Sequence, residues 1–107
     1  MIHRVEYTER SRRHLLEAVE WIAIRAPMAA KRWLDDLEEA VSRLQEHPER
    51  FRYAPENEHH DVEIRQLLFG KRRGQYRILF TVEEERVVIL DVRHSMCQRL
   101  GPGELDS

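Results

Sequence analysis

The sequence predicts an α+β fold in which a helical hairpin packs on one face of an antiparallel sheet. Two observations favour this fold class. In the first half of the 107-residue chain, apolar residues recur at helical spacing in two consecutive segments. In the second half, three short segments are rich in β-branched and aromatic residues, which is typical of strands. With one short strand at the start, the predicted order is β-α-α-β-β-β, and residues 1–100 form one domain.

The N-terminal segment predicts a strand that runs directly into a helix. Residues 2–7 (IHRVEY) place Val5 and Tyr7 at strand spacing, and Thr8 is a suitable helix N-cap. Residues 9–25 repeat apolar side chains every three or four positions, which predicts one buried helical stripe. The stripe consists of Leu15, Leu16, Val19, Ile22 and Ala23.

A second helix is predicted over residues 28–46, because Pro27 interrupts the period and is tolerated in a first helical turn. The very short connection predicts an antiparallel hairpin of helices. Trp33 falls on the apolar stripe of the second helix, whereas Trp21 lies at the edge of the first. Any apolar flank that the sheet leaves uncovered is therefore a candidate contact for a partner or for a second copy.

The remaining chain predicts a loop, a three-stranded meander and a flexible tail. Residues 48–61 hold two prolines and no sustained period, so they are expected to form a loop. Strands are expected over residues 62–69, 75–82 and 87–93, separated by turns at hairpin distances. The tail, residues 101–107, has nothing to bury and is expected to be flexible.

Composition excludes several classes of function. The chain has 18 basic and 20 acidic residues and a formal charge of −2, so no global positive field would hold it on nucleic acid. A single cysteine, Cys97, cannot form an internal disulfide, and no apolar run approaches the length of a membrane span. We therefore expect a soluble cytoplasmic protein that does not associate with a membrane.

A local basic segment stands against this neutral background. Between residues 64 and 82 there are five basic residues and no carboxylate. If residues 70–74 form the hairpin loop, Arg77 lies opposite Leu67 and Arg65 lies opposite Leu79. The two arginines are then expected on the same exposed sheet face, within reach of one anion. Lys71, Arg72 and Arg73 would form the rim of that site.

The last strand brings either Arg93 or His94 to the same face, and the sequence leaves the choice open. A three-residue turn after the second meander strand would place Arg93 beside Arg65 and Arg77. A four-residue turn would place His94 there instead, because a slip of one residue reverses every side chain.

Several segments together resemble the RelE/ParE superfamily of bacterial toxins. They are the helix pair with a Pro48 stop, the strands VEIRQLL and YRILF, and the closing LDVRH with Arg99 after it. The resemblance covers residues 1–100. It implies a toxin that a co-expressed antitoxin keeps inactive. The implied assembly is a toxin–antitoxin hetero-oligomer or a toxin homodimer.

The superfamily implies two alternative activities. RelE-like members cut mRNA on the ribosome without a metal. That reading makes Arg65, Arg77 and Arg93 the groups that stabilise charge on the phosphorane, and His94 the acid or base. ParE-like members inhibit DNA gyrase. In either reading, Lys71, Arg72, Arg73 and Arg99 are candidate contacts with the target or the antitoxin.

The ParE-like reading is preferred. No tyrosine follows the last strand, and the ending VRHSMCQR resembles the ParE-type close. The alternatives are an mRNA endonuclease and a non-toxic member that only binds antitoxin. No cofactor is implied. His59-His60-Asp61 is not expected to bind metal, because adjacent histidines diverge and no further ligand cluster follows.

Overall fold

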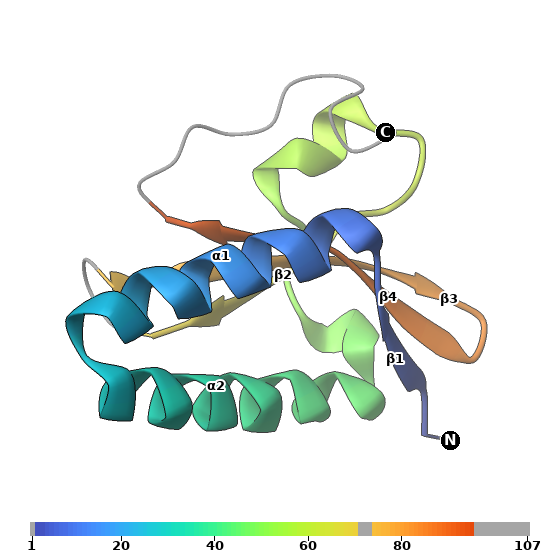
Figure 1. Cartoon of the computed structure of the whole chain (residues 1–107). Coiled ribbons are helices and arrows are strands. Elements are labelled where there is room, and N and C mark those ends of the chain that lie inside the picture. Colours follow the sequence, from blue (N-terminus) through green and yellow to red (C-terminus); the bar gives the residue numbers. More distant parts are fainter. Residues whose placement is uncertain (1, 71–73, 96–107) are drawn as a thin grey trace.

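The computed structural model describes residues 2–70 and 74–95 and confirms the predicted α+β element order (Figure 1). The regular elements are β1 (Arg4–Tyr7), α1 (Glu9–Arg25), α2 (Pro27–Ser42), β2 (Arg65–Phe69), β3 (Tyr76–Glu83) and β4 (Arg86–His94). Three short 3₁₀ helices lie between α2 and β2: η1 (Arg43–Gln45), η2 (Pro48–Arg50) and η3 (Pro55–His59). In the described part of the chain, no helix is long and apolar enough to cross a membrane.

The ends of both helices follow from local chemistry. Thr8 caps α1, since its hydroxyl accepts a hydrogen bond from the Ser11 backbone N–H at 3.1 Å. The last carbonyl bond of α1 is closed by the Ala26 N–H, which donates to Ile22 O at 2.7 Å. Pro27 then occupies the first turn of α2, where its missing N–H costs no helical hydrogen bond. The predicted hairpin boundary is therefore confirmed.

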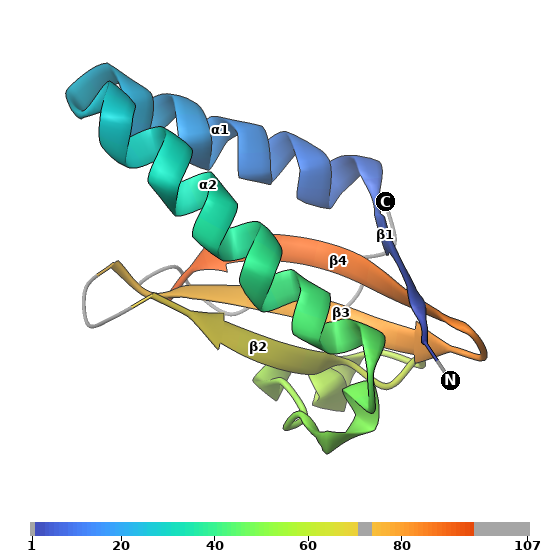
Figure 2. The same cartoon turned by 90° about the horizontal axis from the view of Figure 1, so that it is seen from below.

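The sheet has the order β1-β4-β3-β2. The meander β2-β3-β4 is antiparallel as predicted, but β1 pairs with β4 in parallel, so the complete sheet is mixed. A parallel neighbour needs a long crossover, and here α1, α2 and the first two meander strands supply it. Figure 2 shows α2 crossing the sheet while α1 runs beside β4.

The main core lies between the helical hairpin and the sheet. It contains Leu37 of α2 and Leu44 of η1, packed against Ile78, Phe80 and Ile89 of β3 and β4. The predicted stripe of the second helix is thus confirmed. The predicted stripe of the first helix is wrong at Leu16, which is exposed. The helix α1 runs beside β4 (Figure 2) and buries its Ser11 and Ala18 side instead.

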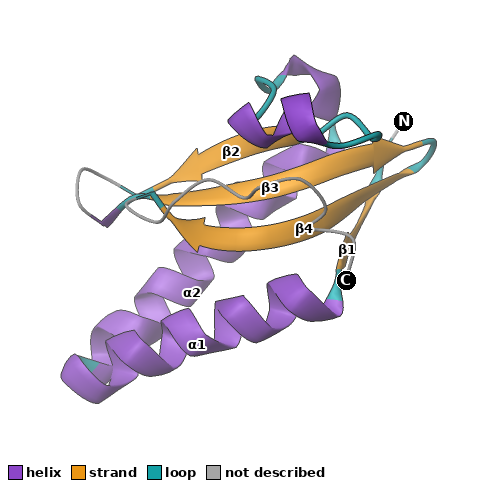
Figure 3. Cartoon of the chain, turned by 90° about the horizontal axis from the view of Figure 1, so that it is seen from above, coloured by secondary structure: helices purple, strands orange, loops and turns teal. Residues whose placement is uncertain are grey.

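The opposite face of the sheet is covered in part, which corrects the expectation of an open surface. The segment expected to be a plain loop folds as η2 and η3 and lies on the sheet side away from α1 and α2 (Figure 3). Ala54 and Ile64 from this segment pack on Leu79 and Leu90 in a second small core. The Asn57 side chain fixes the fold of the segment by accepting the Ile64 N–H at 2.8 Å.

Two ionisable groups near β1 have perturbed pKa values. Burial raises the pKa of the Tyr7 hydroxyl, and the negative charge of Glu38 raises it further. A hydrogen bond to Glu83 raises the pKa of the Arg86 guanidinium, and a hydrogen bond to Glu6 raises it further. The Arg86 contact with Glu6, at 2.8 Å, links β4 to the neighbouring β1.

Candidate functional site

Arg77 is buried rather than displayed on an open face. Both of its Nη atoms donate to the Glu56 carboxylate, at 2.9 and 2.7 Å, and Nη1 also lies 3.3 Å from Gln66 Oε1. The Arg77 side chain is 9% exposed and the Glu56 side chain 0%. Because Glu56 comes from η3, this bidentate ion pair ties the covering segment to β3. The expectation that Arg77 faces solvent is therefore wrong.

Arg65 lies on the other face of the sheet from Arg77. Phe69 pairs with Tyr76, which shifts the pairing of β2 with β3 by one residue from the predicted register. That slip places Arg65 opposite Phe80. The Arg65 Nη1 donates to Phe51 O at 2.7 Å, and the guanidinium lies 4.3 Å from the Tyr53 ring centroid. The expected anion site shared by the two arginines is therefore wrong.

A β-bulge decides the orientation of the end of β4. The turn pairs Glu83 with Arg86, and that register alone would place His94 on the Arg77 face. The pairing then shifts by one residue between Leu79 and Phe80. As a result Arg93 lies opposite Arg77 and His94 lies opposite Tyr76. Although they are neighbours in the sheet, Arg77 binds Glu56 and Arg93 binds a different carboxylate, Asp91.

Asp91 is a buried acceptor shared by several side chains, and no sequence prediction named it. Its Oδ1 lies 2.5 Å from His14 Nδ1 and accepts the Val92 N–H at 2.9 Å. Its Oδ2 accepts from Arg10 Nε at 3.3 Å and Arg93 Nη1 at 3.4 Å. The sequence does contain a signal for this contact, because an aspartate inside the apolar run VVILDV needs buried partners. Those partners come from α1, far away in the chain.

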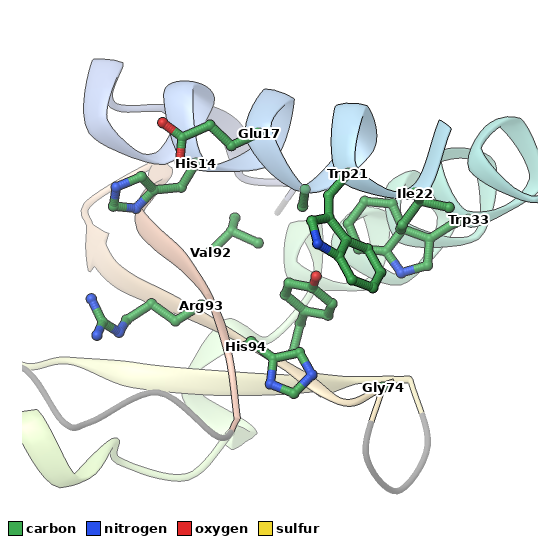
Figure 4. Close-up of a pocket in the computed structure, with 11 residues that line it drawn as sticks. His14, Glu17, Trp21, Ile22, Trp33, Gly74, Val92, Arg93 and His94 are labelled. Carbon is green, nitrogen blue, oxygen red and sulfur yellow. The ribbon is translucent and has the colours of Figure 1, made fainter. Parts of the chain in front are cut away.

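A cavity of about 820 Å³ opens between the helical hairpin and the ends of β3 and β4 (Figure 4). Trp33 and His94 each meet the ring of Tyr76 edge-on, with centroids 5.2 and 5.1 Å apart. Trp21 covers one side and is 58% exposed, with the Arg25 guanidinium 3.8 Å from its ring centroid. The lining residues are His14, Glu17, Ala18, Trp21, Ile22, Trp33, Gly74, Tyr76, Val92, Arg93 and His94.

The cavity brings together Arg93 and His94 but neither Arg65 nor Arg77. The other candidate contacts, Lys71, Arg72, Arg73 and Arg99, lie outside the described residues, as do Cys97 and the tail. Within residues 2–70 and 74–95, no three His, Cys, Asp or Glu side chains are grouped so that they could hold a metal ion.

The comparisons with known proteins agree with this fold. The family model of the ParE toxin of the type II toxin-antitoxin system, parDE, matches residues 5–97. A structure of the chromosomal ParDE toxin-antitoxin system from P. aeruginosa has a chain that superposes with a TM-score of 0.67 at 19% identity. The match covers 87% of this chain and 96% of the other, which shows a shared fold. No curated protein sequence matches the chain. Since the family model spans most of its length, the chain belongs to the ParE toxin family of type II toxin-antitoxin systems.

Proposed function

We propose that the chain is a growth-inhibiting toxin that acts on DNA gyrase in the cytoplasm and is neutralised by a cognate antitoxin. Its family membership over residues 5–97 supports the toxin role. The observation that favours gyrase over RNA as the target is the ion pair in which both Nη atoms of Arg77 donate to the Glu56 carboxylate.

That ion pair matters because RNA cleavage needs several positive groups around one phosphate. A phosphorane carries two negative charges, and its cations must converge with an acid and a base. In this chain Arg77 is neutralised by a buried carboxylate, and Arg65 is held on the other face by Phe51 and Tyr53. His94 faces the ring of Tyr76 in the cavity. This separation supports an inhibitor of gyrase rather than the RelE-like nuclease alternative.

A supercoiling assay with purified gyrase tests the proposal. The chain, added at micromolar concentration, is expected to slow the supercoiling of relaxed plasmid. Total mRNA from cells that express the chain is expected to stay intact. Unimpaired supercoiling together with fragmented mRNA would overturn the assignment in favour of the nuclease, and unimpaired growth would indicate a member that only binds antitoxin.

The cavity and the hairpin tip beside it are the surface that we assign to the antitoxin. Large apolar side chains are exposed there, and exposed apolar surface next to a cavity is typical of a protein-binding site. A helical segment with apolar residues on one face would fit this surface by placing a side chain against the aromatic wall. Trp21 lines the cavity, and Ile24 and Met28 are exposed on either side of the turn between the helices.

Trp21→Ala is expected to weaken antitoxin binding by about 10- to 100-fold, the range of an aromatic hot spot. Because Trp21 is 58% exposed, the free energy of unfolding should change little. Val62→Ala is the matched control, since Val62 is also exposed but does not line the cavity. The affinity is measured by calorimetry with the cognate antitoxin. Equal affinities for the two variants would place the antitoxin elsewhere.

A further inference from the structure

Trp21 is the most exposed of the aromatic side chains that line the cavity. It is 58% exposed, whereas Trp33, Tyr76 and His94 are partly buried. Figure 4 shows the Trp21 indole extending from α1 beside these rings. A large exposed side chain has several rotamers to choose from and loses conformational entropy when it is fixed. The shape of the cavity therefore depends on what holds this indole in place.

Arg25, in the last turn of α1, contacts both the ring and the backbone of Trp21. The two residues are four positions apart and are therefore neighbours on the helix surface. The Arg25 guanidinium lies 3.8 Å from the centroid of the indole, and its Nη1 donates to Trp21 O at 2.9 Å. Arg25 itself does not line the cavity, so its contribution to this surface passes through Trp21.

Arg50 provides a comparison elsewhere in the fold. Its guanidinium lies 5.0 Å from the centroid of Phe51, and neither of these residues lines the cavity. Of the three arginine–ring contacts among the described residues, that of Arg25 is the shortest. Both Arg25 and Arg50 are exposed. Arg50 is therefore a matched control for the removal of an exposed arginine from an aromatic ring.

We propose that Arg25 is a positioning residue for the antitoxin, and that it holds the Trp21 indole as a fixed wall of the cavity in the free toxin. This role rests on the proposed antitoxin site. A partner that docks on a side chain already in place does not have to order that side chain on binding, and the affinity is higher for that reason. Large aromatic residues are frequent anchors of protein interfaces, so the order of this one has a direct effect on binding.

The order of the Trp21 side chain can be measured in the free toxin by nuclear magnetic resonance. The full chain, made by cell-free synthesis with ¹⁵N-tryptophan, gives one indole N–H signal for each of its two tryptophans, and Trp21→Ala assigns them. Arg25→Ala should lower the order parameter of the Trp21 indole to below about 0.6, the range of flexible groups, and leave that of Trp33 unchanged. Arg50→Ala should change neither. An unchanged Trp21 order parameter in Arg25→Ala would overturn the proposal.

Calorimetry with the cognate antitoxin measures the effect on binding. Arg25→Ala should weaken the affinity about three- to tenfold, because the indole is still present but has lost its cation–π contact. Arg50→Ala should bind like the wild type. Arg25→Lys keeps the positive charge but has no planar group to stack, so its affinity should fall between those of the wild type and Arg25→Ala. Wild-type affinity for Arg25→Lys would contradict a role for the planar contact.

A double variant separates positioning from a direct contact with the antitoxin. If Arg25 acts through the indole, Arg25→Ala should have no further effect in the Trp21→Ala background. An equal loss of affinity in both backgrounds would mean that Arg25 contacts the antitoxin directly, and it would overturn the proposal. Wild-type affinity for Trp21→Ala would show that the antitoxin site itself is wrong. A loss for Trp21→Ala with none for Arg25→Ala would overturn the positioning role alone.

Discussion

Replacing Glu56 with Ala is expected to lower the free energy of unfolding by about 3–5 kcal/mol. The side chain of Glu56 is 0% exposed and accepts both Nη atoms of Arg77, which itself is only 9% exposed. The substitution would leave the guanidinium buried without its carboxylate, and the desolvation of that charge would no longer be compensated. It would also release η3 from β3, because Glu56 is the η3 residue that binds Arg77.

Urea denaturation followed by circular dichroism measures this loss. Glu58→Ala is the matched control, because Glu58 lies on the same short helix and is exposed, and it should change stability by less than about 0.5 kcal/mol. The double variant Glu56→Leu/Arg77→Met removes both charges and should recover to within about 1.5 kcal/mol of the wild type. Similar small effects for Glu56→Ala and Glu58→Ala would show that the ion pair does not stabilise the covering segment.

Asp91→Ala has the second largest expected effect, a loss of about 2–4 kcal/mol. It removes the acceptor shared by His14, Arg10 and Arg93, and it leaves two guanidinium groups near each other without the carboxylate. The expected loss is smaller than for Glu56, since Arg10 and Arg93 are 20% and 17% exposed and can turn partly toward water.

The same denaturation experiment tests Asp91, with the exposed Asp61→Ala as control. The stability of Asp91→Asn should fall between those of Asp91→Ala and Asp61→Ala. The amide keeps one acceptor oxygen for the Val92 N–H but loses the charge. If Asp91→Ala is as stable as Asp61→Ala, the contacts of Asp91 do not stabilise the packing of α1 on β4.

The elements of the fold could be predicted from the sequence because their signals are local. Thr8 marks the start of α1, Pro27 separates the two helices, and the period changes at residue 62, shortly before β2 begins at Arg65. These signals depend on neighbouring residues and on one apolar face. The exposure of Trp21 agrees with its predicted place at the edge of the helical stripe.

The candidate site could not be predicted in the same way, because it depends on register. A shift of one residue in the pairing of β2 with β3 moves Arg65 to the other face from Arg77, and one bulge in β4 reverses the orientation of Arg93 and His94. Neither the shift nor the bulge has a composition signal. The partners of the buried charges are also distant, since Glu56 and Arg77 come from different elements and Asp91 binds α1.

The sequence also did not predict that residues 48–61 cover the face of the sheet opposite α1 and α2, for a related reason. Residues 48–61 show no period, yet Ala54 and Glu56 within them are buried against the sheet. An irregular segment packs through a few specific contacts, which the sequence alone does not locate.

In the proposed function, Arg77 supports the fold and the toxin inhibits gyrase through other surfaces. Growth arrest and gyrase inhibition by the Glu56→Leu/Arg77→Met variant test this claim most directly, once circular dichroism has verified that the variant is folded. The variant is expected to arrest growth and to slow supercoiling as strongly as the wild-type chain. A folded double variant that no longer inhibits gyrase, beside an active wild type, would contradict the claim and would return Arg77 to the functional site.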